Sequence, residues 1–134
     1  MTIKLSIPRL PESGNKIIHF SGWQRQEYRT LWHEEVNIAV LLWLRDYEAS
    51  GSRIDDKFPF LKANVILTMY FPDLRSRDKG NYIRGCKPVL DGLVQAGIIE
   101  DDEYYPKKKC DDHYEMEYDK KHPRTEIIIE EVEE

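Results

Sequence analysis

The most constraining feature of the chain is a series of apolar residues that recur at steps of three and four between Tyr28 and Tyr47. The members of the series between these two tyrosines are Leu31, Trp32, Val36, Ala39, Val40 and Trp43. This spacing is typical of one stripe of an α-helix, and Ser21-Gly22-Trp23-Gln24 fits a capping box in front of it. We therefore expect a long helix over about residues 24–49, ended near Ser50-Gly51, whose aromatic stripe packs in the core or against a dimer partner.

Four other segments have the composition or alternation of β-strands. Ile3, Leu5 and Ile7 alternate with polar residues, and residues 61–71 are β-rich up to Phe71-Pro72-Asp73. Two more strands are expected near the C-terminal end, where Tyr114, Met116 and Tyr118 alternate with acids and residues 125–132 are rich in β-branched side chains. We expect these last two strands to form a hairpin around Lys121-His122-Pro123.

The remaining segments predict two loops and a second helix. Residues 8–16 and 73–80 contain loop-forming residues, and residues 87–96 have helical spacing with Pro88 in the first turn and Gly97 as a C-terminal cap. The resulting order, β-α-β-α-β-β with one long and one short helix, predicts an α+β fold in which helices cover one side of a mixed sheet.

Length and composition fit one domain over residues 1–134 with an acidic C-terminal end. No apolar run is long enough to span a membrane and no signal peptide is recognised, so we expect a cytoplasmic protein with no membrane partner. Cys86 and Cys110 lie far apart and outside any paired motif, which predicts free thiols.

The formal net charge of -5 argues against nucleic-acid binding if it is taken globally, but the charges are unevenly distributed. Basic residues gather between Leu74 and Lys87 and again at Lys107-Lys108-Lys109, whereas the last nine residues carry five glutamates and no base. A basic face on an acidic protein and ordinary solvated charges are both consistent with this pattern.

Carboxylates stand at both ends of the short helical segment, at Asp78 and at Asp101-Asp102, and the basic cluster lies beside the first. Divalent cations prefer carboxylate oxygens, so this arrangement predicts a metal site next to a phosphate-binding surface. Asp78 and Asp102 are the first candidates as ligands. Asp101 and Asp91 are the second, because two adjacent acids in an extended segment do not both point inward.

The same stretch resembles the signature of the RusA-type Holliday junction resolvases. The resemblance is carried by Arg77-Asp78-Lys79-Gly80-Asn81, then by Lys87 to Leu93, and then by Ala96 to Asp102. It implies a RusA-like fold with catalytic residues Asp78, Lys87 and Asp102, a metal held by Asp78, Asp102 and Asp101, and Asn81 beside the metal. Arg75, Arg77, Lys79, Asn81 and Arg84 would contact DNA.

Two departures from the family pattern affect this transfer. Gly80 stands where the family has its second aspartate, and the spacing from Asn81 to Lys87 is longer because of an apparent insertion, Arg84-Gly85-Cys86. Either Arg84 or Lys87 could take the role of the family's lysine. Lys87 is preferred because it keeps the four-residue step to Asp91.

The resemblance implies a homodimeric endonuclease that uses Mg²⁺, with Mn²⁺ as an alternative, and resolves four-way junctions in DNA recombination and repair. A two-fold symmetric junction cut at two places needs two active sites, which a homodimer supplies. Because Gly80 removes a carboxylate, a catalytically weakened or inactive relative that binds branched DNA or a protein partner is the alternative. The net charge favours a third reading, an acidic interaction domain.

A transition-metal site at Cys110-Asp111-Asp112-His113 is rejected because no second ligand motif accompanies it. The other histidines are scattered through the chain and are expected in ordinary surface or core positions. No glycine-rich phosphate loop and no Gly-x-Ser-x-Gly element is present, so the sequence gives no support to P-loop or serine hydrolase chemistry.

Overall fold

The computed structural model describes residues 1–52 and 57–133. In chain order the elements are β1 (Thr2–Ile7), α1 (Gly14–Ile17), α2 (Gly22–Ala49), β2 (Ala63–Phe71), α3 (Lys79–Gly85), α4 (Lys87–Gln95), β3 (Cys110–Tyr118) and β4 (Arg124–Glu131). The fold is therefore α+β, and the expected positions of the first two strands, the long helix and the short helix are confirmed within a few residues.

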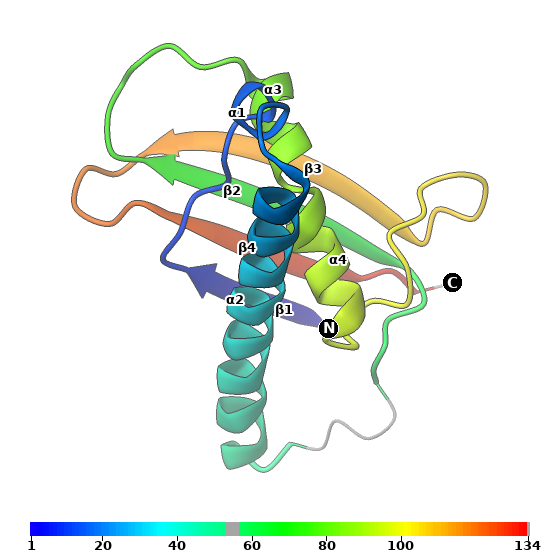
Figure 1. Cartoon of the computed structure of the whole chain (residues 1–134). Coiled ribbons are helices and arrows are strands. Elements are labelled where there is room, and N and C mark those ends of the chain that lie inside the picture. The colour runs from blue at the N-terminus through cyan, green and yellow to red at the C-terminus, as the bar shows by residue number, and fades with distance from the viewer. Residues whose placement is uncertain (53–56, 134) are drawn as a thin grey trace.

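The four strands form one mixed sheet in the order β1-β4-β2-β3 (Figure 1). Strand β4 is antiparallel to both β1 and β2, whereas β3 is parallel to β2. The expected hairpin between the last two strands is wrong, because β2 lies between them. With β2 between them, β3 and β4 lie two strand spacings apart, which is about 10 Å. The link over residues 119–123 can span up to about 16 Å and is therefore long enough to connect them.

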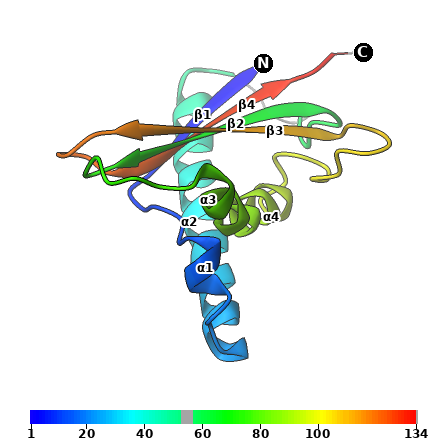
Figure 2. The same ribbon diagram turned by 90° about the horizontal axis from the view of Figure 1, so that it is seen from above.

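The helices lie on one face of the sheet (Figure 2), as the order of the elements predicts. Residues that alternate along the strands point to the helices and are buried, among them Ile3, Leu5, Val65, Leu67, Ile127 and Ile129. The long helix α2 contributes Trp32, Val36 and Val40 to the same core. This one-sided arrangement leaves the helix layer free to build clefts between helices.

Two glycines allow backbone segments to approach closely in the helix layer. A Cβ atom on Gly92 of α4 would lie 3.1 Å from the Cβ of Val36, so this residue lets α4 pack tightly on α2. A Cβ on Gly85, at the end of α3, would lie 1.9 Å from the carbonyl oxygen of Glu12. The segment before α1 is thus in contact with the break between α3 and α4.

Tyr28 of α2 fixes the same junction by hydrogen bonds. Its hydroxyl donates to the carbonyl oxygen of Gly85 at 2.9 Å and accepts from the backbone N–H of Glu12 at 2.9 Å. Burial raises the pKa of Tyr28 to about 12, so the hydroxyl keeps its proton and both bonds at neutral pH.

Two helices were not expected. The segment over residues 8–16, expected as a loop, includes the start of α1, and Ser13 caps that helix by accepting from the backbone N–H of Lys16. The other is α3, which begins inside the second expected loop with Asp78 as its N-cap. A separate α3 ends at Gly85, so residues 81–91 are two helices broken at Cys86 and not one continuous helix.

Both cysteines are free and buried, as expected. Burial raises the pKa of Cys86 to about 12 and has the same effect on Cys110, so neither thiol is reactive at neutral pH. Strand alternation separates the four residues Cys110 to His113, because Cys110 is buried under the helices and His113 is exposed. In the part of the chain that the structure describes, no helix has the length and apolar character needed to cross a membrane.

Candidate functional site

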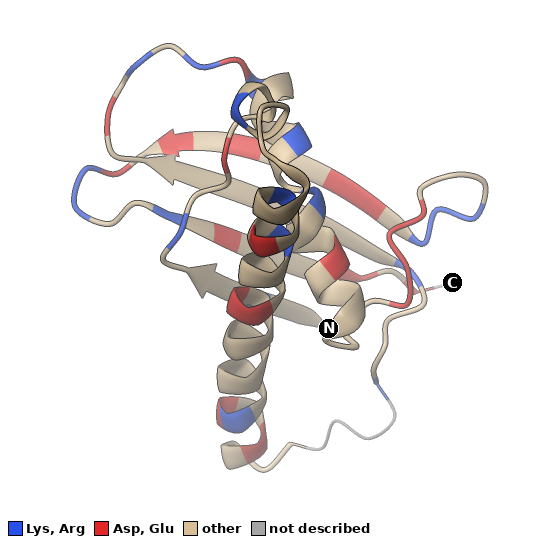
Figure 3. Ribbon diagram, in the orientation of Figure 1, with Lys and Arg blue, Asp and Glu red and all other residues tan. Residues whose placement is uncertain are grey.

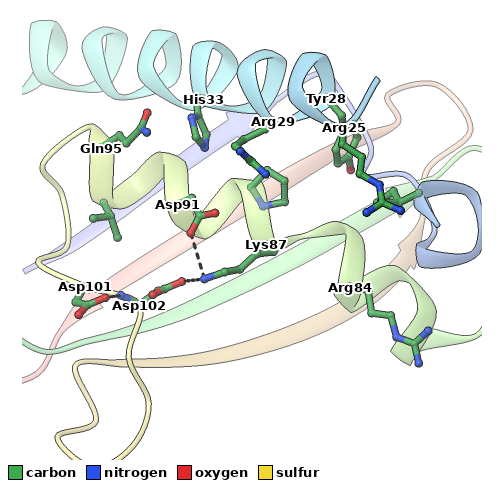
Figure 4. A pocket seen from close by; sticks show the side chains of 13 residues that line it. Arg25, Tyr28, Arg29, His33, Arg84, Lys87, Asp91, Gln95, Asp101 and Asp102 are labelled. Atoms are coloured by element: carbon green, nitrogen blue, oxygen red, sulfur yellow. Dashed lines mark hydrogen bonds and ion pairs between the residues drawn. The ribbon is translucent and has the colours of Figure 1, made fainter. Parts of the chain in front are cut away.

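A cavity of about 660 Å³ lies between α2, the α3–α4 pair and the segment that follows α4 (Figure 4). Its lining is rich in charged side chains from segments far apart in the sequence. The lining residues used below are Arg25, Arg29, His33, Arg84, Lys87, Asp91, Asp101 and Asp102. Acids occupy one end of the cavity, arginines mark the other, and Lys87 lies between them.

The acidic end is organised around the ammonium group of Lys87, the first residue of α4. Its Nζ lies 3.1 Å from Oδ1 of Asp91, one helical turn further on, and also donates to Oδ2 of Asp102. Asp101 accepts a hydrogen bond of 2.7 Å from the backbone N–H of Asp102 and thereby fixes the turn. Two carboxylates therefore converge on one cation, and a third is adjacent to them.

The electrostatics of this pair follow from its position. Partial burial opposes ionisation of Asp102, but the hydrogen bond and charge of Lys87 outweigh it and hold the pKa of Asp102 below its usual value. Partial burial also opposes the charge on Lys87, but the two carboxylates raise its pKa. Lys87 and Asp102 are therefore both charged at neutral pH, and the ammonium lies between the side chains of Asp91 and Asp102.

The other end of the cavity is basic. Among the described residues neither Arg29 of α2 nor Arg84 of α3 has a hydrogen-bond or ion-pair partner, and Arg25 donates only to the carbonyl oxygen of Ile18 at 3.2 Å. Arginines without acidic partners beside a cavity are suited to bind phosphate oxygens. Arg25, Arg29 and His33 were not found from the sequence, although their four-residue spacing along one helix was a usable signal.

Asp78, the first candidate metal ligand, is not among the residues that line this cavity. It is the N-cap of α3, and its Oδ1 accepts from the backbone N–H of Gly80 at 3.0 Å. Asn81 is similarly engaged, because its side-chain oxygen accepts from the backbone N–H of Asn15 at 2.8 Å. Lys87, Asp101 and Asp102 thus line one cavity, whereas Asp78 caps a helix outside it.

The side chains expected to contact DNA in the loop before α3 and at its first residue differ in exposure and in their ion pairs. Arg77 is only 11% exposed: it pairs with Asp73 at 2.7 Å and stacks on Phe71 with 4.1 Å to the ring centroid. Arg75 is 80% exposed, with a single 3.3 Å ion pair to Asp73, and Lys79 at the start of α3 is exposed. Arg77 therefore holds the loop, and Arg75 and Lys79 are available at the surface.

Of the two candidates for the family's lysine role, Lys87 contacts the acids. Arg84 also lines the cavity, but it makes no ion pair with these acids and marks the opposite end (Figure 4). Its stem packs against α1, since a Cβ on Gly14 would lie 2.8 Å from Cδ of Arg84. The longer spacing in this chain therefore gives Lys87 and Arg84 separate positions.

The donor set at the acidic end fits a hard divalent cation. Mg²⁺ is commonly held by one or two carboxylates with water and substrate phosphate as further ligands, and Asp91 and Asp102 supply two carboxylates around one point. Over the described residues, no three His, Cys, Asp or Glu side chains form a metal-binding group. The site is thus suited to a weakly held ion shared with a phosphate, not to a closed structural metal.

No protein-family model and no curated protein matches the chain.

Proposed function

We propose that the chain is a RusA-like, Mg²⁺- or Mn²⁺-dependent endonuclease that binds branched DNA, above all four-way junctions, and hydrolyses phosphodiester bonds. The observation that carries the proposal is the single cavity in which Lys87, Asp91 and Asp102 meet and whose other end carries three arginines. Hydrolysis of a phosphodiester with a metal ion requires both kinds of charge: carboxylates bind the metal, and cationic side chains bind the phosphate.

In this proposal each residue of the cavity has a role. Asp102 and Asp91 would hold the metal ion, which supplies positive charge at the scissile phosphate and activates water as the nucleophile. Lys87, released from one of its carboxylates, stabilises the negative charge that develops on the phosphate. Arg25, Arg29 and Arg84 would hold flanking phosphates, and the exposed Arg75 and Lys79 would contact the DNA backbone from the loop before α3 and the start of α3.

A homodimer is part of the proposal, and the outer face of α2 supports it. Ile38, Leu41 and Leu42 of α2 are 55%, 56% and 48% exposed. An apolar face of this kind on a helix is commonly covered by a second protein surface, and a two-fold axis would place the same face of a second copy against it. Leu41→Glu should lower the dimer fraction measured by light scattering, whereas Glu48→Gln, on an exposed position of the same helix, should not.

A labelled four-way junction incubated with and without Mg²⁺ or Mn²⁺ tests the activity. We expect metal-dependent cleavage by the wild type, loss of cleavage in Asp102→Asn with junction binding retained, and no loss in Asp111→Asn. Asp111 is a matched control because it is the strand neighbour of Cys110, which is buried under the helices, and so points to the opposite face of the sheet. Wild-type protein that leaves the junction intact in both metals would contradict the nuclease assignment.

The second candidate function is binding of branched DNA without cleavage. It is favoured by the position of Asp78, which caps a helix outside the cavity, and by Gly80, which leaves no second carboxylate there. Tight, salt-dependent binding of the junction without cleavage would support this alternative, since phosphate contacts alone give a salt-dependent affinity.

A further inference from the structure

The segment that follows the acidic end of the cavity is a tight loop over residues 103–109, which we name the tyrosine–lysine loop. It projects beyond the end of the sheet beside α4 (Figure 1), and its tip is basic (Figure 3). The proposed nuclease mechanism uses none of its residues.

The base of the loop is closed by hydrogen bonds. The backbone N–H of Cys110 donates to the carbonyl oxygen of Glu103 at 3.0 Å, and the N–H of Lys107 donates to the Glu103 side chain at 3.0 Å. Lys109 pairs with Glu100 at 2.8 Å across the same base. The loop is therefore anchored at its two ends, which gives its tip a defined position.

The tip presents flat aromatic surface and positive charge to solvent. Tyr105 is 82% exposed and Tyr104 is 49% exposed. The ammonium of Lys108 lies 5.9 Å from the centroid of the Tyr104 ring, and Lys107 is also exposed. Residues 104–108 contain no acid. Exposed aromatic rings next to lysines are the combination that binds single-stranded nucleic acid, by base stacking and phosphate contacts.

The distance from the cavity suits such a role. Tyr105 follows Asp102 by three positions in the chain, so their Cα atoms lie at most about 11 Å apart. This is at most about three base steps along one strand. A strand whose phosphate is held at Lys87 and Asp102 would therefore present a nearby base at the tyrosine–lysine loop.

We propose that the tyrosine–lysine loop stacks Tyr105 on an unpaired base of the DNA and thereby directs the cavity to sites where base pairing is interrupted. This inference rests on the proposed function, because it specifies that the DNA substrate contains an unpaired base. Stacking requires an exposed base face, which a continuous duplex does not offer and a branch point or single strand does.

The test measures binding of three fluorescent probes by anisotropy: a four-way junction, a single-stranded oligonucleotide and a continuous duplex. Tyr105→Ala should weaken binding to the junction and the single strand by about 5- to 100-fold and leave duplex binding unchanged. Tyr105→Phe should restore binding because it keeps the ring. Tyr118→Ala is the matched control, since Tyr118 is also exposed but lies at the opposite end of β3.

Two further readouts separate stacking from charge. The slope of log affinity against log salt should be the same in Tyr105→Ala as in the wild type, whereas each of Lys107→Ala and Lys108→Ala should flatten it by ~0.9 or less. A 2-aminopurine base at the branch point should be quenched by the wild type and by Tyr105→Phe, and not by Tyr105→Ala.

The outcomes distinguish this inference from the proposed function. Unchanged binding in Tyr105→Ala, or an equal loss on the duplex, overturns the stacking role while the nuclease proposal stands. Tyr105-dependent binding of the single strand without any junction binding supports stacking and overturns the junction assignment. A wild type that binds none of the three probes overturns both.

Discussion

Lys87, the first residue of α4, donates a hydrogen bond to Asp102, fifteen residues further along the chain, and also pairs with Asp91. One ammonium group therefore contacts two carboxylates in the place where the proposed metal would be held. This relationship makes the role of Lys87 separable from that of its acidic partners.

Lys87→Met should lower junction cleavage by about 10²- to 10³-fold, because the charge that stabilises the phosphate is lost. Binding of Mn²⁺ measured by calorimetry should be retained or strengthened, since a competing cation leaves the two carboxylates. Lys120→Met, which alters an exposed lysine that does not line the cavity and has no role in the proposal, is the control. Wild-type cleavage by Lys87→Met, or loss of metal binding, would show that Lys87 has another role.

Substitutions at Asp78 distinguish a helix-capping role from a metal-binding role. Asparagine caps helices as well as aspartate, so Asp78→Asn should keep both stability and cleavage, whereas Asp78→Ala should lower the free energy of unfolding by about 1 kcal/mol. Denaturant unfolding and the junction assay measure the two effects. An Asp78→Asn protein of normal stability that does not cleave would restore Asp78 as a metal ligand.

Gly80→Asp restores the carboxylate that the RusA signature contains. Gly80 does not have a positive φ, and a Cβ there would meet only Oδ1 of Asp78, at 3.5 Å. The backbone therefore imposes no glycine, and we expect the variant to melt at or above the wild-type temperature, with Gly80→Ala gaining about 0.5–1 kcal/mol. Because Gly80 lies outside the cavity, the metal requirement for cleavage by the Gly80→Asp variant should be the same as that of the wild type. Stronger cleavage in Mg²⁺ would instead indicate a second site at α3.

Gly85 provides the opposite case on the same helix. Its Cβ would lie 1.9 Å from the carbonyl oxygen of Glu12, a backbone atom that cannot move aside like a flexible side chain. We expect Gly85→Ala to lower the free energy of unfolding by about 1–3 kcal/mol or more. Equal stability of Gly85→Ala and Gly80→Ala would contradict the close packing of the segment that contains Glu12 on the end of α3.

The loop before α3 should respond to acid. Hydrogen bonds from Arg77 and Arg75 lower the pKa of Asp73 below its usual value. The pair therefore stabilises the folded state above about pH 4, and its contribution is lost as the pH falls through the folded pKa. The stability difference between the wild type and Asp73→Asn should shrink below about pH 4. A gap that stays constant from pH 6 to pH 3 would show that the Asp73 charge does not contribute.

Local sequence patterns predicted most helices and strands well. They did not predict which segments, distant in the sequence, pair with each other. The spacing from Leu31 to Trp43 predicted α2, and alternation predicted the buried face of β1 at Ile3, Leu5 and Ile7. The pairing of β3 with β2 was missed because a short polar link resembles a hairpin turn whether or not a strand intervenes. Helix α3 was missed because Asp78, Lys79 and Gly80 have the composition of a loop.

The candidate site was predicted in the same uneven way. Lys87 and Asp91 share a helix face because of their four-residue step, and the sequence indicated that step. That Asp102 meets them depends on how the chain turns after Gly97, whose φ of 77° reverses its direction. The contribution of α2 depends on packing at Gly92 and Val36, a contact between positions far apart in the sequence.

The position of β4 has a consequence for how the chain can acquire its structure. This strand follows the other three in the sequence, yet it lies between β1 and β2 (Figure 1). A growing polypeptide that has not yet reached Arg124 offers β1 no neighbour and leaves one side of β2 open. Contacts between the two extremities of the chain close loops of long sequence separation, and such contacts slow folding. Until β4 joins the sheet, the exposed edges of β1 and β2 are sites at which other nascent chains can pair.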